Sequence, residues 1–211
     1  MYPARYFQEQ HPERLLSLVQ QSPLASILFD NHLSGLNEVV YTPLVFDEAK
    51  WVFIGHVVKS NPLVQQNDSM VKLLFHGPNS YISPSHSEAL TLPSWLYANV
   101  QIEGRFELVA DHQLKRDMMT QITDHFEREF HDPWLVSSLE TNKLDTLFKH
   151  IAFFTISIEQ WHGNFKLSQN KSPKVKAQIM QSLKTRGNEA LSELVGSYID
   201  DEDTNNKVAN Y

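Results

Sequence analysis

Lysine, serine and asparagine are adjacent at Lys59-Ser60-Asn61, and a second lysine, Lys72, follows a little further along the chain. Ammonium, hydroxyl and amide groups are donors of the kind that hold a phosphate group. These residues fall at the ends of predicted strands or on neighbouring strands, so the site would need no glycine loop. The pattern predicts a phosphate site. The alternative is a plain solvated turn at Lys59-Ser60-Asn61-Pro62.

Aromatic side chains of the same region could bind a planar ring. Tyr81, Trp95 and Tyr97 follow the lysines in the sequence, and each offers a flat face. The alternative is that Trp95 fills the interior of a barrel, because aromatic residues near turns are usually packing residues.

The common catalytic motifs are absent from the sequence. It contains no G-x-G-x-x-G, no P-loop, no H-E-x-x-H and no G-x-S-x-G. It also contains no cysteine, which excludes disulfides, thiol catalysis, iron–sulfur clusters and cysteine-bound zinc.

The chain has ten histidines, so metal and haem sites need to be considered. His125 and Glu129 have helical spacing, and His131 follows them. Phe126 and Phe130 mark the apolar side of that helix, so His125 and Glu129 should lie on its solvated side. We therefore predict no metal site there. A second set of histidines keeps open a haem or another flat ligand: His56, His76 and His86.

The elements that must position these residues are mostly short strands. The clearest is Ala98–Val109, which alternates apolar and polar residues with a period of two. The other predicted strands are 24–29, 39–46, 51–58, 70–75 and 151–161, with a turn at Gly77-Pro78-Asn79. Many short strands with short turns predict an antiparallel β-barrel, and the helices around it predict the α+β class.

Helical periodicity appears at four places. The predicted helices are 12–20, 111–130, 134–149 and a tail that begins after Asn170 and breaks at Gly187. We expect Asp111 and Ser172 to cap their helices, with Pro173 in a first helical position. We also expect Lys166, Ser168, Gln169 and Asn170 to cap the C-terminal helix and pin it to the barrel. A second short helix should follow Gly187 and end near Ile199.

This order of elements predicts three parts. Residues 1–170 would form the barrel, 171–199 a helical extension packed on it, and 200–211 a flexible tail.

Composition narrows the class of protein. The formal net charge is −7 and no helix-turn-helix is recognisable, so direct DNA binding is not expected. No apolar run is long enough to span a membrane, and Met1 to Gln10 lacks the pattern of a signal peptide. We therefore expect a cytoplasmic protein.

The chain resembles the PaiB family, which contains FMN-binding proteins and transcriptional regulators. The similarity rests on short strings spread over most of the sequence. They are Met1-Tyr2-Pro3, Pro23-Leu24-Ala25, Gly55-His56 with Asn61-Pro62, His76-Gly77-Pro78, Tyr81-Ile82-Ser83-Pro84 and Phe165-Lys166-Leu167-Ser168-Gln169-Asn170. The last string is similar to the family's G-K-x-K-L-S-Q-N signature and is quite specific.

The resemblance implies a split β-barrel of the FMN-binding type, also found in pyridoxamine-phosphate oxidases and flavin reductases. Those relatives are homodimers that hold flavin at the subunit interface, so the resemblance implies a homodimer with FMN as cofactor. The residues implied around the flavin are His56, Lys59, Ser60, Asn61, Lys72, Tyr81, Trp95 and Tyr97.

The sequence departs from the family pattern at several of these strings. Lys59 stands where the family has arginine, and a lysine keeps the charge but loses the bidentate fork. Leu96 replaces an asparagine, His86-Ser87 replaces a tryptophan–tyrosine pair, and Asn164 replaces a lysine. These departures predict weaker flavin binding than in the oxidases.

Two functions follow from the resemblance. The first is an FMN-binding protein, with flavin reductase or oxidase activity as one form of it and flavin sensing as another. The second is a regulator that acts through a protein partner, its flavin site degenerate. Whether the protein is an enzyme stays open, because no residue is identified as a general acid or base. Haem in place of flavin is the third reading.

Overall fold

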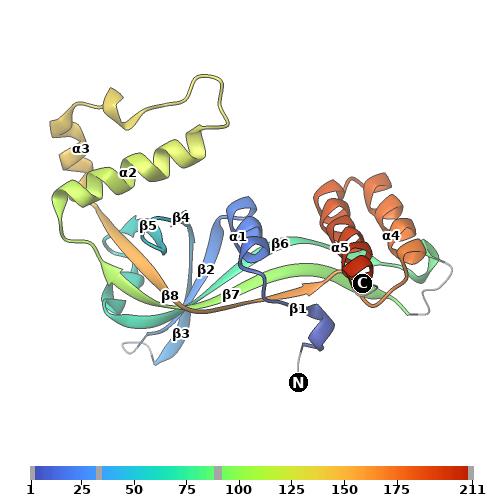
Figure 1. The fold of residues 1–211 in the computed structure, drawn as a ribbon. Helices are drawn as coiled ribbons and strands as arrows, with labels where there is room; N and C mark the ends of the chain where they lie inside the picture. The colour runs from blue at the N-terminus through green and yellow to red at the C-terminus, as the bar shows by residue number, and fades with distance from the viewer. Residues whose placement is uncertain (1–2, 32–34, 88–91, 209–211) are drawn as a thin grey trace. The chain divides into compact units, whose positions relative to one another are not determined.

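The eight strands of the described residues form one antiparallel sheet (Figure 1). The computed structural model describes residues 3–31, 35–87 and 92–208, with Asn31, Leu36 and 200–208 as backbone only. The strands are β1 (Gln8–Glu9), β2 (Leu24–Asn31), β3 (Leu36–Pro43), β4 (Val45–Asp47), β5 (Val52–Val58), β6 (Ser69–Ile82), β7 (Ser94–Leu108) and β8 (Ile151–Lys166). The α-helices are α1 (Pro12–Gln21), α2 (His112–Glu127), α3 (Thr141–Phe148), α4 (Pro173–Thr185) and α5 (Glu189–Val208). The short 3-10 helices are η1 (Arg5–Phe7), η2 (Pro62–Gln66), η3 (Pro84–His86) and η4 (Val136–Ser138).

The strand order in the sheet is β3-β2-β6-β7-β8-β5-β4, and β1 pairs with β8. The sheet curls so that β3 and β5, from near opposite ends of the strand order, come together. A hydrogen bond shows this contact: the Thr42 hydroxyl of β3 donates to the carbonyl of His56 on β5 at 3.2 Å. A curled antiparallel sheet with helices outside it confirms the predicted α+β class and its barrel.

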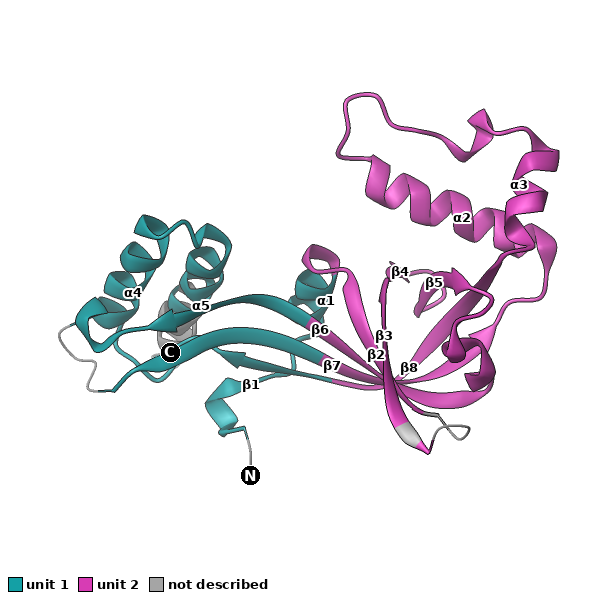
Figure 2. Ribbon diagram, turned by 180° about the vertical axis from the view of Figure 1, so that it is seen from behind, with its two compact units in different colours: residues 1–19, 76–100, 162–211 teal, residues 20–75, 101–161 magenta. Residues whose placement is uncertain are grey.

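The chain forms two compact units (Figure 2). Unit 1 consists of residues 1–19, 76–100 and 162–211, and unit 2 of residues 20–75 and 101–161. Strands β6, β7 and β8 each contribute residues to both units. The three-part division of the chain expected from the sequence stays a prediction.

The interior of unit 2 is filled by aromatic rings. Phe53 lies 5.4 Å from Phe75, and Phe106 lies 4.8 Å from Phe154, as ring centroids. All four are fully buried. They come from four strands, so one core ties those strands together.

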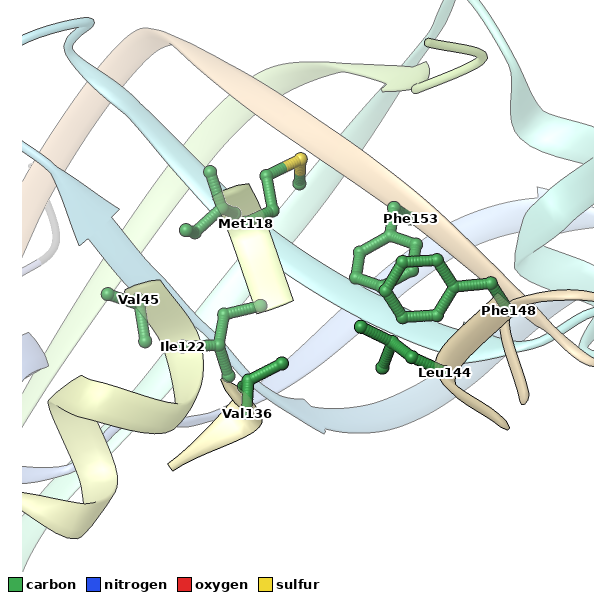
Figure 3. Close-up of a cluster of buried hydrophobic side chains, with 8 residues drawn as sticks. Val45, Met118, Ile122, Val136, Leu144, Phe148 and Phe153 are labelled. Atoms are coloured by element: carbon green, nitrogen blue, oxygen red, sulfur yellow. The ribbon is translucent and has the colours of Figure 1, made fainter. Parts of the chain in front are cut away.

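Helices α2 and α3 cover the outer face of β4, β5 and β8 (Figure 3). Val45, Ile54 and Phe153 come from these strands, and Met118 and Ile122 come from α2. Val136, Leu144 and Phe148 complete the cluster. The apolar spacing of α2 is explained as far as Glu127, where the helix ends, but Phe130 lies beyond it and is exposed, so its predicted place on the apolar side is wrong. Asp111 caps the helix as predicted, because it accepts from the Leu114 N–H at 2.7 Å.

In unit 1, α4 packs against α5. Ser172 accepts from the Val175 N–H and Pro173 begins α4, as predicted. Gln169 does not cap the helix: its side chain bonds the backbone of Leu167 and Phe165, and so holds the turn after β8. Helix α5 continues to Val208, beyond the predicted end at Ile199.

The predicted turn at Gly77-Pro78-Asn79 is wrong, because these residues lie inside β6. What changes there is the phase of the strand. Gly77 is buried and the next buried residue is Ser80, so the alternation slips by one. Gly77 itself has no room for a side chain, because a Cβ would lie 2.9 Å from the Ala98 carbonyl oxygen.

Two other boundaries differ from the prediction. The strand expected at 39–46 is two strands, because Leu44 turns away and its N–H bonds the Pro23 carbonyl at 2.9 Å. The helix expected from Trp134 starts only at Thr141. The Trp134 N–H donates to the Glu127 carboxylate at 2.8 Å, which holds this segment out of a helix.

Candidate flavin-binding residues

The segment Lys59-Ser60-Asn61 leaves the end of β5 in a turn that backbone bonds fix. The Lys59 N–H donates to the His150 carbonyl and the Asn61 N–H to the Val58 carbonyl, both at 2.9 Å. The Asn61 amide oxygen accepts from the Leu63 N–H at 2.9 Å and so caps η2. Because these bonds use backbone groups and one amide oxygen, the Lys59 ammonium, the Ser60 hydroxyl and the Asn61 NH2 stay available.

The side chains of Lys59 and Ser60 are exposed. Among the side chains that the structure describes, Lys59 has no ion-pair partner. A fixed turn with an uncompensated cation matches the chemistry of a phosphate group better than that of a plain connecting turn.

Lys72 lies on β6 opposite Leu28 of β2. Its ammonium is 3.0 Å from the carboxylate of Glu103, and both side chains are exposed. It also lines a hollow of about 400 Å³ on unit 2. The hollow is lined by Leu28, Phe29, Asp30, Asn37, Met70, Val71, Lys72 and Glu103. An anion near Lys72 would therefore compete with Glu103.

Lys59 and Lys72 do not lie on adjacent strands, because β7 and β8 stand between β5 and β6 in the sheet. The segment that joins them runs through η2, which contacts β2. Lys72 is paired across from β2, whereas the Lys59 backbone bonds His150, so the two lysines have different neighbours.

His56 lies on β5 opposite Phe153, and the two rings are 5.5 Å apart. Burial lowers the pKa of His56, because the charged imidazolium loses its water. The ring is therefore neutral at physiological pH and sits at the rim of the α2–α3 cluster.

Tyr81, Trp95 and Tyr97 belong to unit 1. The Trp95 indole N–H donates to the Asn79 amide oxygen at 3.1 Å, and its ring is 6.3 Å from that of Tyr81. Trp95 is 50% exposed, so it does not fill the interior of the barrel. The structure thus brings Tyr81 and Trp95 together and leaves both partly open to solvent.

The sequence analysis missed an exposed apolar surface on the outer side of β3, β2 and β6. Tyr41 lies opposite Ser26, which in turn lies opposite Leu74, and Val39 lies opposite Leu28. Tyr41 is 69% exposed, and Leu24, Val39 and Met70 are also exposed. The sequence signal for this surface is that β2 and β3 carry apolar residues on both of their faces.

The histidines considered for haem have other roles. The His76 ring is 3.2 Å from the Asn99 amide oxygen, and the His86 ring accepts from the Ser83 N–H at 3.2 Å. His56 belongs to unit 2, whereas His76 and His86 belong to unit 1. Within the described residues, no three histidine, aspartate or glutamate side chains are grouped as a metal site. No helix in that part of the chain is long and apolar enough to cross a membrane.

The residues present fit a flavin mononucleotide in their chemistry. Its phosphate needs cationic and hydroxyl donors, which Lys59, Ser60 and Asn61 offer at one turn. Its ring needs exposed apolar or aromatic surface, which both units carry.

Comparison with known proteins agrees with this chemistry. Residues 1–160 match the family described as "Putative FMN-binding domain". The chain is 24% identical to protease synthase and sporulation protein PAI 2 of Bacillus subtilis, over 89% of this chain and 91% of that protein. It is also 24% identical to an uncharacterized protein of Emericella nidulans, over 88% of this chain and 92% of that one.

Two solved structures share the fold. The FAD- and heme-binding protein of Mycobacterium smegmatis has a TM-score of 0.58 and 16% identity, covering 76% of this chain and 73% of that one. The flavocytochrome Anf3 of Azotobacter vinelandii has a TM-score of 0.57 and 15% identity, covering 77% and 71%. The family match spans most of the sequence, and the curled antiparallel sheet is the same. The chain therefore belongs to the FMN-binding domain family and is a split-barrel homologue of the Bacillus PAI 2 protein.

Proposed function

We propose that this protein binds FMN, with the phosphate at Lys59, Ser60 and Asn61. One observation carries the proposal: the turn after β5 is fixed by its own backbone bonds, and it presents an exposed lysine that has no ion-pair partner among the described side chains, in a family of FMN-binding domains. Lys72 and His56 are the further candidates within unit 2. Tyr81, Trp95 and Tyr97 of unit 1 stay predictions from the sequence.

Bound FMN would supply the electron transfer, since the redox chemistry belongs to the cofactor. The protein's own residues would bind and orient it. Lys59 would neutralise phosphate charge, and the Asn61 NH2 would donate to a phosphate or ribityl oxygen. The neutral His56 would offer a hydrogen bond without adding charge.

We further propose that the protein is a homodimer that works in the cytoplasm. Support for the dimer is the exposed apolar surface of β3, β2 and β6, defined by Leu24, Val39, Tyr41 and Met70. Burying such a surface against a second copy removes apolar area from water. No feature of residues 3–31, 35–87 and 92–208 favours a separate regulatory function, so we propose none.

The test is a titration of the purified protein with FMN and with riboflavin, followed by quenching of flavin fluorescence. Riboflavin lacks the phosphate, so the pair isolates the phosphate contacts. We expect Lys59→Gln to weaken FMN binding about tenfold, as befits a charge-assisted hydrogen bond at an exposed site, and to leave riboflavin binding unchanged.

Lys143→Gln is the control, because Lys143 is an exposed lysine on α3 paired with Glu140. It should leave both affinities unchanged. Failure of FMN to bind the wild-type protein at all would refute the proposed function. An equal loss of FMN and riboflavin affinity in Lys59→Gln would refute the role of Lys59.

A further inference from the structure

A second polar hollow lies on unit 1, between η3 and the C-terminal half of α4. Its size is about 450 Å³. The lining residues are Ser85, His86, Ser87, Gln178, Gln181, Ser182, Thr185 and Arg186. Each of these described residues is polar and none of them is acidic, although the chain as a whole carries a net charge of −7.

Arg186 is held in a fixed position at this hollow. Its Nη1 is 3.3 Å from the Ser80 hydroxyl, its Nη2 is 3.2 Å from the Tyr81 carbonyl, and its Nε is 3.3 Å from the Ser182 carbonyl. A guanidinium has five N–H groups, so these bonds leave one on each terminal nitrogen. Within the part of the chain that the structure describes, no carboxylate pairs with Arg186.

His86 and Gln178 add further donors. The His86 Nδ1 accepts from the Ser83 N–H, so the neutral ring carries its proton on Nε2. Burial and the nearby Arg186 charge both lower the pKa of His86 and keep the ring neutral. The buried Ser87 hydroxyl donates to the Gln178 amide oxygen at 2.6 Å, which leaves the Gln178 NH2 as a donor.

We propose that this hollow binds a phosphate-type oxyanion, either free phosphate or the phosphate group of a small polar molecule. A tetrahedral oxyanion needs donors from several directions, and the guanidinium, imidazole, amide and hydroxyl groups come from two elements. Among the described residues that line the hollow, none is a carboxylate that would repel an anion.

The proposal goes beyond FMN binding and does not depend on it. None of the lining residues belongs to the Lys59, Ser60, Asn61 and Lys72 set. His86 and Ser87 stand where the resembled family has two aromatic residues, so at these two positions the lining departs from the family pattern.

The test is a titration of the full-length protein with inorganic phosphate, at constant pH and ionic strength. The readout is the ¹H–¹⁵N signal of the His86 ring, assigned by its loss in His86→Gln. We expect a saturable shift with a dissociation constant in the millimolar range, typical of a small ion at an open site. Acetate, which is planar, should shift the signal less at the same concentration.

Gln181→Glu is the decisive variant, because it adds a negative charge to the hollow at an exposed helical position without touching Arg186. It should weaken phosphate binding about tenfold by repulsion. Gln65→Glu adds the same charge at an exposed position outside the hollow and should change the affinity less than about twofold.

A non-saturable shift, an equal effect of the two glutamate variants, or equal binding of acetate and phosphate would each overturn the proposal. Glycerol 3-phosphate serves as the second probe. Tighter binding of this ester than of inorganic phosphate assigns the site to a phosphorylated molecule, and the reverse assigns it to the free ion.

Discussion

Glu9 is a buried carboxylate, only 3% exposed, and its partners show how unit 1 holds its N-terminal segment. Its oxygens accept from the N–H groups of Gln10 and His11, from the Arg14 guanidinium at 3.2 Å and from the Tyr198 hydroxyl of α5. The Arg14 guanidinium also lies over the Tyr198 ring, 4.2 Å from its centroid. Burial alone would raise the pKa of Glu9, but the bonds from Tyr198, His11 and Arg14 outweigh it and lower that pKa.

Tyr198→Phe should destabilise the protein by about 1–2 kcal/mol at neutral pH, because it removes one donor from a buried carboxylate. The measurement is urea unfolding, with Tyr6→Phe as a control at an exposed tyrosine.

The lowered pKa of Glu9 sets the pH dependence of this stabilisation. Its stabilisation is present above the unfolded-state pKa and is lost as the pH falls through the folded-state pKa. The difference between wild type and Tyr198→Phe should therefore shrink in acid, and a gap that grows in acid would contradict this role.

Glu103 restrains Lys72, and its removal should strengthen FMN binding. Glu103→Gln frees the Lys72 ammonium and deletes one negative charge beside it. We expect FMN affinity to rise about threefold, in keeping with the modest energy of an exposed ion pair. Riboflavin affinity should stay constant. A fall in FMN affinity on Glu103→Gln would show that Lys72 does not serve the phosphate.

At the scale of elements, β7 and β8 approach each other closely at Gly104. A Cβ at this position would lie 2.5 Å from the Ser157 carbonyl oxygen and 2.7 Å from the Ile156 side chain. The glycine is required because backbone atoms cannot move aside as a side chain end can.

Gly104→Ala should therefore cost about 3 kcal/mol of stability, near the upper end for overpacked sites. Gly196→Ala is the matched control, because there the new Cβ meets only the flexible end of Met180 and the residue lies in α5. Thermal unfolding should show a clear loss for the first variant and little change for the second. Equal melting temperatures would mean that β7 can shift away from β8.

Strands and helices whose apolar residues repeat at a regular spacing were predictable from the sequence. Ala98, Val100, Ile102 and Phe106 are all buried, as the alternation in β7 predicted, and the apolar stripe of α2 faces the sheet. The failures lie where long-range contacts override local signals. Gly77-Pro78-Asn79 has turn composition, yet it continues β6 because the strand is paired there and changes phase.

The residue types predicted only part of the candidate flavin site. The sequence identified a lysine beside a serine and an asparagine, and the turn that fixes them is present. It could not show that Glu103 pairs with Lys72, because that contact joins strands far apart in the sequence. It also could not show the exposed outer face of β2 and β3, since apolar residues on both faces read as burial.

At the scale of the whole molecule, the exposed apolar face of β3, β2 and β6 predicts association with a second copy. Tyr41→Glu places a charge at its most exposed residue and should convert the proposed dimer to a monomer, because burying an unpaired carboxylate is costly. Light scattering after size-exclusion chromatography measures the mass. Tyr6→Glu, at an exposed tyrosine of η1, is the control and should leave the mass unchanged. A wild-type protein of monomeric mass would reject the proposed dimer.

The chain passes between the two units at 19/20, 75/76, 100/101 and 161/162, and this has a consequence for synthesis. The first residues of unit 1 emerge from the ribosome early. The Glu9 carboxylate cannot form its hydrogen bond with Tyr198 until that residue is synthesised, near the end of the chain. Unit 2 can complete its own sequence much sooner. The nascent chain therefore carries an N-terminal segment whose partners are not yet made, and neither unit can be transplanted into another protein as one uninterrupted stretch of gene.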